Sequence, residues 1–62
     1  MKYRVVDTTD HNYRGMILEL DSIVVGMKIK LRDYVFEVDK IIEKDNEIKL
    51  VSYNYIIILK EV

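Results

Sequence analysis

The sequence predicts a small all-β domain, and three observations lead to that fold class. Apolar and charged residues alternate over residues 27–38, which is the two-residue period of a strand with one buried face. Isoleucine, valine and tyrosine, which suit a half-buried sheet surface, are abundant. Short polar turns separate the alternating segments. Because the chain has only 62 residues, we expect residues 1–62 to form one domain with one core.

Two strands joined by a polar loop are predicted in the first part of the chain. Residues 2–7 alternate and form the first strand, and residues 8–12 are small or polar and form the loop. Residues 13–20 alternate again, which predicts a second strand with its even-numbered apolar side chains on one face. Residues 21–25 contain three β-branched residues, which favours a turn or irregular strand over a helix. Gly26 then supplies backbone freedom before the next strand.

A hairpin is predicted over residues 27–38, with its turn at Arg32 and Asp33. This register places Ile29 opposite Phe36. A slip of one residue would scatter the apolar side chains over both faces, so the pattern specifies one register. In that register six apolar side chains share the buried face: Met27, Ile29, Leu31, Tyr34, Phe36 and Val38.

The remaining strands follow a break in the alternation near residues 39–40, where a bulge or bend restores the phase. Residues 41–44 and 47–51 flank Asp45-Asn46, two residues that tolerate the positive φ of a tight hairpin turn. Residues 55–59 are apolar on both faces. That segment is either a strand covered on both sides or a strand whose outer face meets a partner.

The order of these segments, with the run from Gly26 to Ile41, resembles the small SH3-like barrel modules of bacteria and phages. The resemblance implies a five-stranded antiparallel SH3-like β-barrel. It concerns folding alone and transfers no functional residues. An OB-like barrel or an open sheet is the alternative arrangement.

Composition excludes several classes of site. The chain has no cysteine and one histidine, which excludes disulfides, thiolate metal sites and a multi-histidine metal site within it. The formal net charge of −1 gives no overall field for nucleic acid or anionic lipid. No apolar run approaches the roughly 18 residues of a membrane span, and the N-terminus lacks a signal-peptide core, so we expect a cytoplasmic location. The absence of Ala, Pro, Gln, Cys and Trp resembles the residue usage of a low-GC bacterium or its phage.

The first loop offers the nearest approach to catalytic chemistry. Asp7, Asp10 and His11 supply two carboxylates and an imidazole, which suggests a partial metal site or an acid–base pair. Such chemistry also needs a walled cleft and further ligands. A polar loop whose side chains bond its own backbone is the favoured interpretation. We therefore expect no enzyme, no metal site and no cofactor.

A second constellation is the basic row, formed by Lys28, Lys30 and Arg32 on the outer face of one predicted strand. Such a row could contact the phosphates of a nucleic acid. Charges on the wet face of a strand also keep it soluble, and Glu37 opposite Lys28 neutralises part of the row. Binding of nucleic acid is therefore the alternative function.

The tyrosines and the last strand instead predict protein contact. Alternation assigns Tyr3 and Tyr34 to the core, and the other three tyrosines are less constrained. The SH3-like resemblance implies a groove with Arg14 near one end. A single small barrel has one core, so the row of Ile56 and Ile58 must find cover from a second copy or a protein partner, unless strand curvature and residues 21–25 cover it. We predict a non-enzymatic binding module with these interface candidates: Tyr13, Arg14, Tyr53, Tyr55, Ile56 and Ile58.

Overall fold

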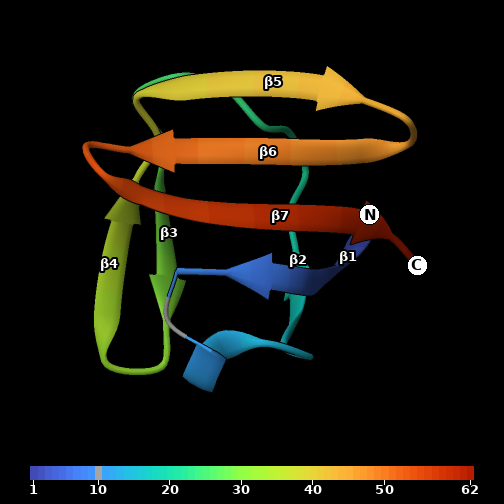
Figure 1. Cartoon of the computed structure of the whole chain (residues 1–62), viewed down its shortest axis with the longest axis horizontal. Coiled ribbons are helices and arrows are strands. Elements are labelled where there is room, and N and C mark those ends of the chain that lie inside the picture. The colour runs from blue at the N-terminus through green and yellow to red at the C-terminus, as the bar shows by residue number, and fades with distance from the viewer. Residues whose placement is uncertain (10) are drawn as a thin grey trace.

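The computed structural model describes residues 1–9 and 11–62, without the side chain of His11. Over this part of the chain the fold is all-β, as predicted, with seven strands and one short 3-10 helix (Figure 1). The elements in chain order are β1 (Lys2–Thr8), η1 (His11–Tyr13), β2 (Ile17–Glu19), β3 (Lys28–Leu31), β4 (Tyr34–Glu37), β5 (Lys40–Lys44), β6 (Glu47–Ser52) and β7 (Tyr55–Glu61).

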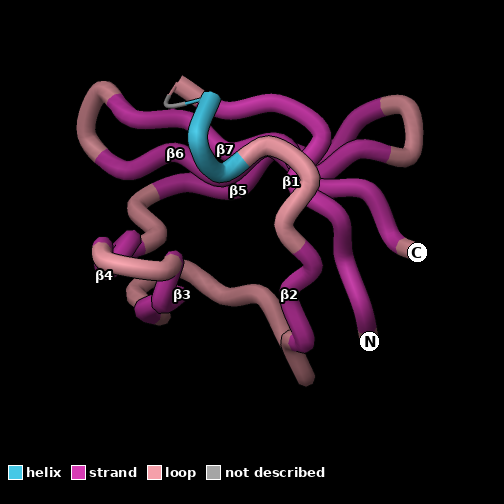
Figure 2. The backbone as a smooth tube through the Cα atoms, turned by 90° about the horizontal axis from the view of Figure 1, so that it is seen from below, coloured by secondary structure: helices cyan, strands magenta, loops and turns pink. Residues whose placement is uncertain are grey.

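The strands divide into an antiparallel sheet and a separate hairpin. Five described strands form the sheet in the order β2-β1-β7-β6-β5, and β3 with β4 forms a two-stranded ribbon. Figure 2 shows the ribbon and the segment between β2 and β3 on one side of β5, β6 and β7. The strands of the described residues do not close into a barrel through hydrogen bonds. The structure therefore establishes the all-β class and the antiparallel five-stranded sheet.

Both predicted hairpins form in the predicted registers. In the ribbon, Ile29 pairs with Phe36. Strands β5 and β6 pair around a two-residue turn in which Asp45 has φ +54° and Asn46 has φ +65°. These left-handed conformations match the right-handed twist of paired strands, and Asp and Asn adopt them at low cost.

The predicted bend lies at Val38 and Asp39, where the chain passes from the ribbon to the sheet. The amide of Val38 donates to the carbonyl of Met27 at 2.9 Å, whereas the next amide, that of Asp39, donates to the carbonyl of Val51 at 2.8 Å. Two consecutive residues therefore bond to different sheets, and this corner brings the ribbon across the inner face of the five-stranded sheet.

The second strand is shorter than predicted. Residues 13–20 were expected to be extended, but β2 covers only Ile17–Glu19 and is preceded by η1. Gly15, between them, has φ +90°, a left-handed conformation that interrupts an extended strand and favours glycine. The predicted faces of the strand are correct, because Leu18 is buried and Ile17 is exposed.

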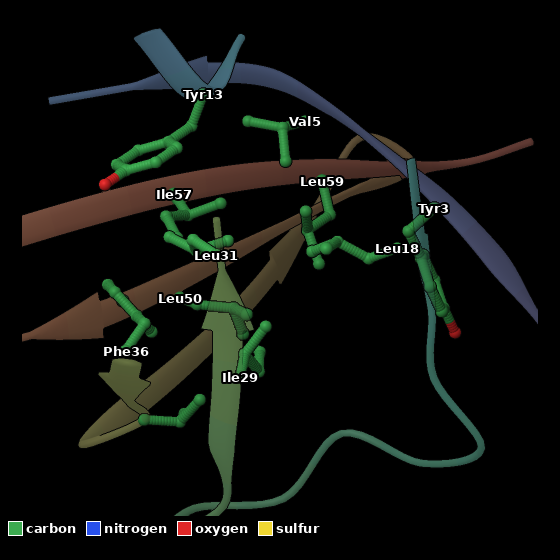
Figure 3. Packing of buried hydrophobic residues seen from close by; sticks show 11 residues of the cluster. Tyr3, Val5, Tyr13, Leu18, Ile29, Leu31, Phe36, Leu50, Ile57 and Leu59 are labelled. Atoms are coloured by element: carbon green, nitrogen blue, oxygen red, sulfur yellow. The ribbon is translucent and has the colours of Figure 1, made fainter. Parts of the chain in front are cut away.

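The core lies between the inner face of the sheet and the ribbon (Figure 3). Tyr3 is buried there, as alternation predicts. Tyr34 differs from prediction: it is 42% exposed, because it lies next to the ribbon's turn at the margin of the core, with its ring centroid 5.5 Å from that of Tyr55. Seven side chains have no exposed surface: Val5, Leu31, Phe36, Val38, Leu50, Ile57 and Leu59.

Candidate protein interface on the outer face of the sheet

The outer face of the five-stranded sheet, defined as the face that points away from the core, carries Ile56 and Ile58. Side chains alternate along β7, so Ile57 and Leu59 enter the core whereas Ile56 and Ile58 point outward and stay partly exposed. The two opposite apolar rows predicted for the last strand are therefore present.

No described segment passes over the outer side of the strands that carry and flank these two isoleucines. Figure 1 looks onto the outer face, and no part of the described chain passes in front of β5, β6 and β7. Residues 21–25, the alternative cover within the monomer, lie on the same side as the ribbon (Figure 2), and Ile23 packs against the core. Residues 21–25 therefore lie over the inner face of the sheet and do not shield Ile56 and Ile58 on the outer face.

Cross-strand pairing extends the two isoleucines into an apolar strip. Ile56 is opposite Val51, and Ile58 is opposite Lys49. Lys49 is in turn opposite Ile42, which is 37% exposed. The apolar strip consists of Ile42, Val51, Ile56 and Ile58. Lys49 is partly buried at its position between Ile58 and Ile42, as is usual for a lysine whose alkyl stem lies along apolar neighbours.

Thr9 fixes one end of the strip. Its amide donates to the carbonyl of Ile56 at 3.0 Å, and its Oγ1 accepts from the amide of Ile56 at 3.0 Å. These bonds hold the chain that leaves β1 against the start of β7. A shallow depression at this end is lined by Asp7, Thr8, Thr9, Lys49, Ile56 and Ile58.

Basic residues surround the strip. The register places six on the outer face: Lys2, Arg4, Lys40, Lys44, Lys49 and Lys60. Four of them, the basic rim, border the strip: Arg4, Lys40, Lys44 and Lys60. The acidic residues on the same face are Asp7, Glu19 and Glu47. All three of these acids already face cations: Glu47 Oε2 lies 3.9 Å from Lys60 Nζ, Asp7 Oδ1 accepts from Arg14 Nη2 at 3.1 Å, and Glu19 Oε1 lies 3.3 Å from the N-terminal ammonium of Met1. The outer face is therefore positive although the chain has a net charge of −1.

Arg14 lies at the margin of this face. Its partner Asp7 is opposite Ile58 in the register, and both side chains of the Arg14–Asp7 pair are more than half exposed. An exposed pair of this kind contributes at most about 1 kcal/mol to stability. Arg14 is therefore held near the strip by a weak interaction.

Tyr13 is buried, whereas the sequence predicts a surface position for it. It is 6% exposed, its ring belongs to the core, and its hydroxyl donates to Asp33 Oδ1 at 2.8 Å. Alternation could not place Tyr13, because it belongs to η1 instead of a strand. Its side chain ties the first loop to the turn of the ribbon, and we do not retain it as an interface residue.

Tyr53 and Tyr55 lie at the end of the sheet where β6 turns into β7. Tyr55 faces the inner side, where its ring packs edge to face on Phe36 with centroids 5.8 Å apart. Tyr53 is 92% exposed and has φ +57°, a left-handed conformation that is costly for an aromatic residue. Its amide donates to Asp39 Oδ2 at 2.8 Å, which holds the turn. Neither ring belongs to the apolar strip.

The basic row is on the ribbon and does not join the outer face. Lys28 and Lys30 are exposed on β3, pointing away from the buried side of the ribbon, and Lys28 is opposite Glu37. Arg32 Nη1 donates to the carbonyl of Asn12 at 2.6 Å, which engages its guanidinium in linking the ribbon to the first loop. Of the three residues predicted to contact phosphates, only Lys28 and Lys30 are therefore exposed side by side on one strand.

The first loop falls partly outside the described residues. Asp10 and the side chain of His11 are not described, and Asp7 pairs with Arg14. Within residues 1–9 and 11–62, the side chains that are described include no group of three His, Cys, Asp or Glu that could hold a metal ion. No helix in that part of the chain has the length and apolar character needed to cross a membrane.

Sequence reasoning identified two members of the strip and missed the other two. Ile42 and Val51 lie on the outward positions of the predicted β5–β6 hairpin, so alternation alone could have placed them on one face. What was missing was the pairing of β6 with β7 through a turn at Tyr53 and Asn54. Comparison of the chain with protein-family models, with curated proteins and with solved structures gives no match.

Proposed function

We propose that this chain is a non-enzymatic binding domain that contacts another protein through the outer face of its sheet. The observation that carries the proposal is the apolar strip, which lies across three strands, is partly exposed, and has no described segment of chain passing over it. A contiguous apolar surface with a polar border is typical of a protein interface, and solvent exposure of such a surface favours association. The partner is either a different protein or a second copy of the chain.

The experiment compares two double variants of a tagged chain. Ile56→Thr with Ile58→Thr removes the centre of the strip and keeps β-branched side chains that suit a strand. Val24→Thr with Val25→Thr is the matched control, because these valines are 54% and 63% exposed and lie in the loop between β2 and β3. Far-ultraviolet circular dichroism and thermal unfolding first establish that both variants are folded.

Binding is then measured in two ways. Analytical ultracentrifugation gives the mass of each protein in solution, and affinity capture from an extract of the source organism identifies bound proteins. We expect the parent and the control to show the same self-association or the same captured protein, and the strip variant to lose it. Equal behaviour of all three proteins would place binding elsewhere and contradict the proposal.

Binding of nucleic acid by the basic row is the second candidate. The exposure of Lys28 and Lys30 on one strand favours it. Two contacts weaken it: the opposing Glu37 offsets part of the positive charge of the row, and the bond to the carbonyl of Asn12 occupies a donor of the Arg32 guanidinium. We therefore rank it below protein contact.

We also propose an SH3-like relationship for the fold. The ribbon that crosses the inner face, followed by a sharp corner at Val38 and Asp39 that leads into the sheet, supports it. A solution structure in which backbone hydrogen bonds join the ribbon to both ends of the sheet would show the closed barrel, and an open sheet in solution would argue against it.

A further inference from the structure

We propose that the outer face takes an acidic partner, namely a protein segment whose aliphatic side chains cover the apolar strip and whose carboxylates pair with the basic rim. This inference rests on the proposed function and specifies its partner. It is carried by the distribution of charge over the faces of the sheet, which the net charge of the chain conceals.

The charge on the outer face is unbalanced. Six basic side chains point outward from the sheet, against three acidic ones. Each of the acids already faces a cation: Asp7 faces Arg14, Glu47 faces Lys60, and Glu19 faces the N-terminal ammonium. None of them can neutralise a further cation fully. The remainder of this chain, with its net charge of −1, must accordingly be negative. A partner that buried this face without supplying carboxylates would leave ammonium groups desolvated and unpaired, which is costly.

The arrangement of the charges also fits one segment of chain lying along the face. Strip residues and lysines are also neighbours across the strands. Ile58, Lys49 and Ile42 are paired side by side on β7, β6 and β5, and Ile56, Val51 and Lys40 are paired in the same way two residues further along. Each such cross-strand row therefore contains a lysine. Neighbouring side chains in a row are about 5 Å apart. A partner with alternating aliphatic and acidic side chains would satisfy both kinds of residue at this spacing.

A second copy is the less suitable occupant. In a two-fold symmetric contact the same patch must face itself, so two positive outer faces would meet. If the two-fold axis lies parallel to the strands, between β6 and β7, Arg4 of one copy approaches Lys44 of the other, since these residues stand at opposite ends of one row. Like charges placed together in this way oppose association.

A nucleic acid is also a less suitable occupant, although it would supply negative charge. Proteins that bind single strands stack bases on aromatic side chains. No aromatic residue occupies an outward position in the described strands of the sheet, and the floor between the lysines is aliphatic. Phosphates would leave that floor uncovered, whereas Ile, Leu or Val side chains of a protein would cover it.

The test is selection from a displayed library of random peptides on three immobilised proteins. The first is the parent chain. The second carries Lys40→Glu and Lys49→Glu, which reverses two charges at the strip. The third carries Lys28→Glu and Lys30→Glu, which makes the same change in net charge on the ribbon and serves as the matched control. Recovered peptides are synthesised and titrated by NMR against the 15N-labelled proteins, beside a single-stranded oligothymidine.

We expect the parent and the control to select peptides rich in Asp or Glu with Ile, Leu or Val, and to bind them with the largest amide shifts in β5, β6 and β7. The Lys40→Glu, Lys49→Glu protein should bind these peptides at least about tenfold more weakly, because like charges then face each other. Raising the salt concentration should weaken binding to the parent.

The inference is overturned if the parent selects no peptide, if its peptides are neutral or basic, or if the strip and ribbon reversals weaken binding equally. Stronger binding of the oligothymidine at the same amides would make nucleic acid the occupant and would also overturn it. The proposed function fails separately: it fails if Ile56→Thr with Ile58→Thr leaves capture of the cellular partner unchanged. Capture that depends on the strip, together with peptides that are not acidic, refutes only the inference.

Discussion

Replacement of Phe36 by alanine tests the account of the core. Phe36 has no exposed surface, is opposite Ile29 in the ribbon, and packs edge to face on Tyr55. Truncating a fully buried phenylalanine leaves a cavity and costs roughly 3 to 5 kcal/mol. A domain of 62 residues has a total stability of roughly 3 to 9 kcal/mol. The Phe36→Ala protein should therefore lose at least about a third of its stability, and it should be unfolded at 25 °C if the parent lies at the lower end of this range.

Urea denaturation, followed by circular dichroism, measures the loss. Lys30→Ala, at an exposed position of the same ribbon, is the control and should change the free energy of unfolding by less than about 0.5 kcal/mol. Ile29→Val gives a value that stays measurable if Phe36→Ala does not fold, with an expected loss of about 0.5 to 1.5 kcal/mol. Equal losses for Lys30→Ala and Ile29→Val would show that the two faces of the ribbon are wrongly assigned.

Three further predictions concern the turns and the basic row. Tyr53→Gly should raise the free energy of unfolding by up to about 1 kcal/mol, since the φ of +57° strains tyrosine by roughly 1–2 kcal/mol and the flexibility of glycine offsets only part of that relief. A loss of stability in urea denaturation would refute this. Tyr13→Phe should cost about 0.5 to 1.5 kcal/mol through the hydrogen bond to Asp33, and no change would show that water replaces it freely. Binding to single-stranded oligonucleotides, measured by fluorescence anisotropy, should be weak and salt-sensitive. Sub-micromolar binding near physiological salt that is lost when the basic row is replaced by alanine would reverse our ranking of the two functions.

The sequence predicted the fold class and the hairpin registers because alternation and turn chemistry act locally. The pairing of Ile29 with Phe36 and the turn at Asp45 and Asn46 both follow from residues within one hairpin. The turn between β6 and β7 was not recognised, because Tyr53 is an unusual residue for a left-handed conformation. Contacts such as Tyr13 to Asp33 span 20 residues and depend on tertiary packing that local patterns do not encode.

The candidate site was predicted in part for the same reason. The outward direction of Ile56 and Ile58 follows from alternation within β7. Two other features depend on the order of the strands in the sheet: that Ile42 belongs to the apolar strip, and that basic residues gather on one face. The basic residues Arg4, Lys44 and Lys60, for example, come from strands that are far apart in the chain. Net charge, a sum over the whole chain, gave no sign of this local excess.

Site-specific photocrosslinking can show whether the outer face binds a protein. Benzoylphenylalanine is placed at Ile42, in the strip, or at Val35, on the ribbon; both are exposed aliphatic positions in strands, at 37% and 53%. After irradiation in an extract of the source organism, we expect a discrete protein adduct at position 42 that excess unlabelled parent chain competes away, and none at position 35. The same adduct at both positions, or an adduct at 35 alone, would contradict it.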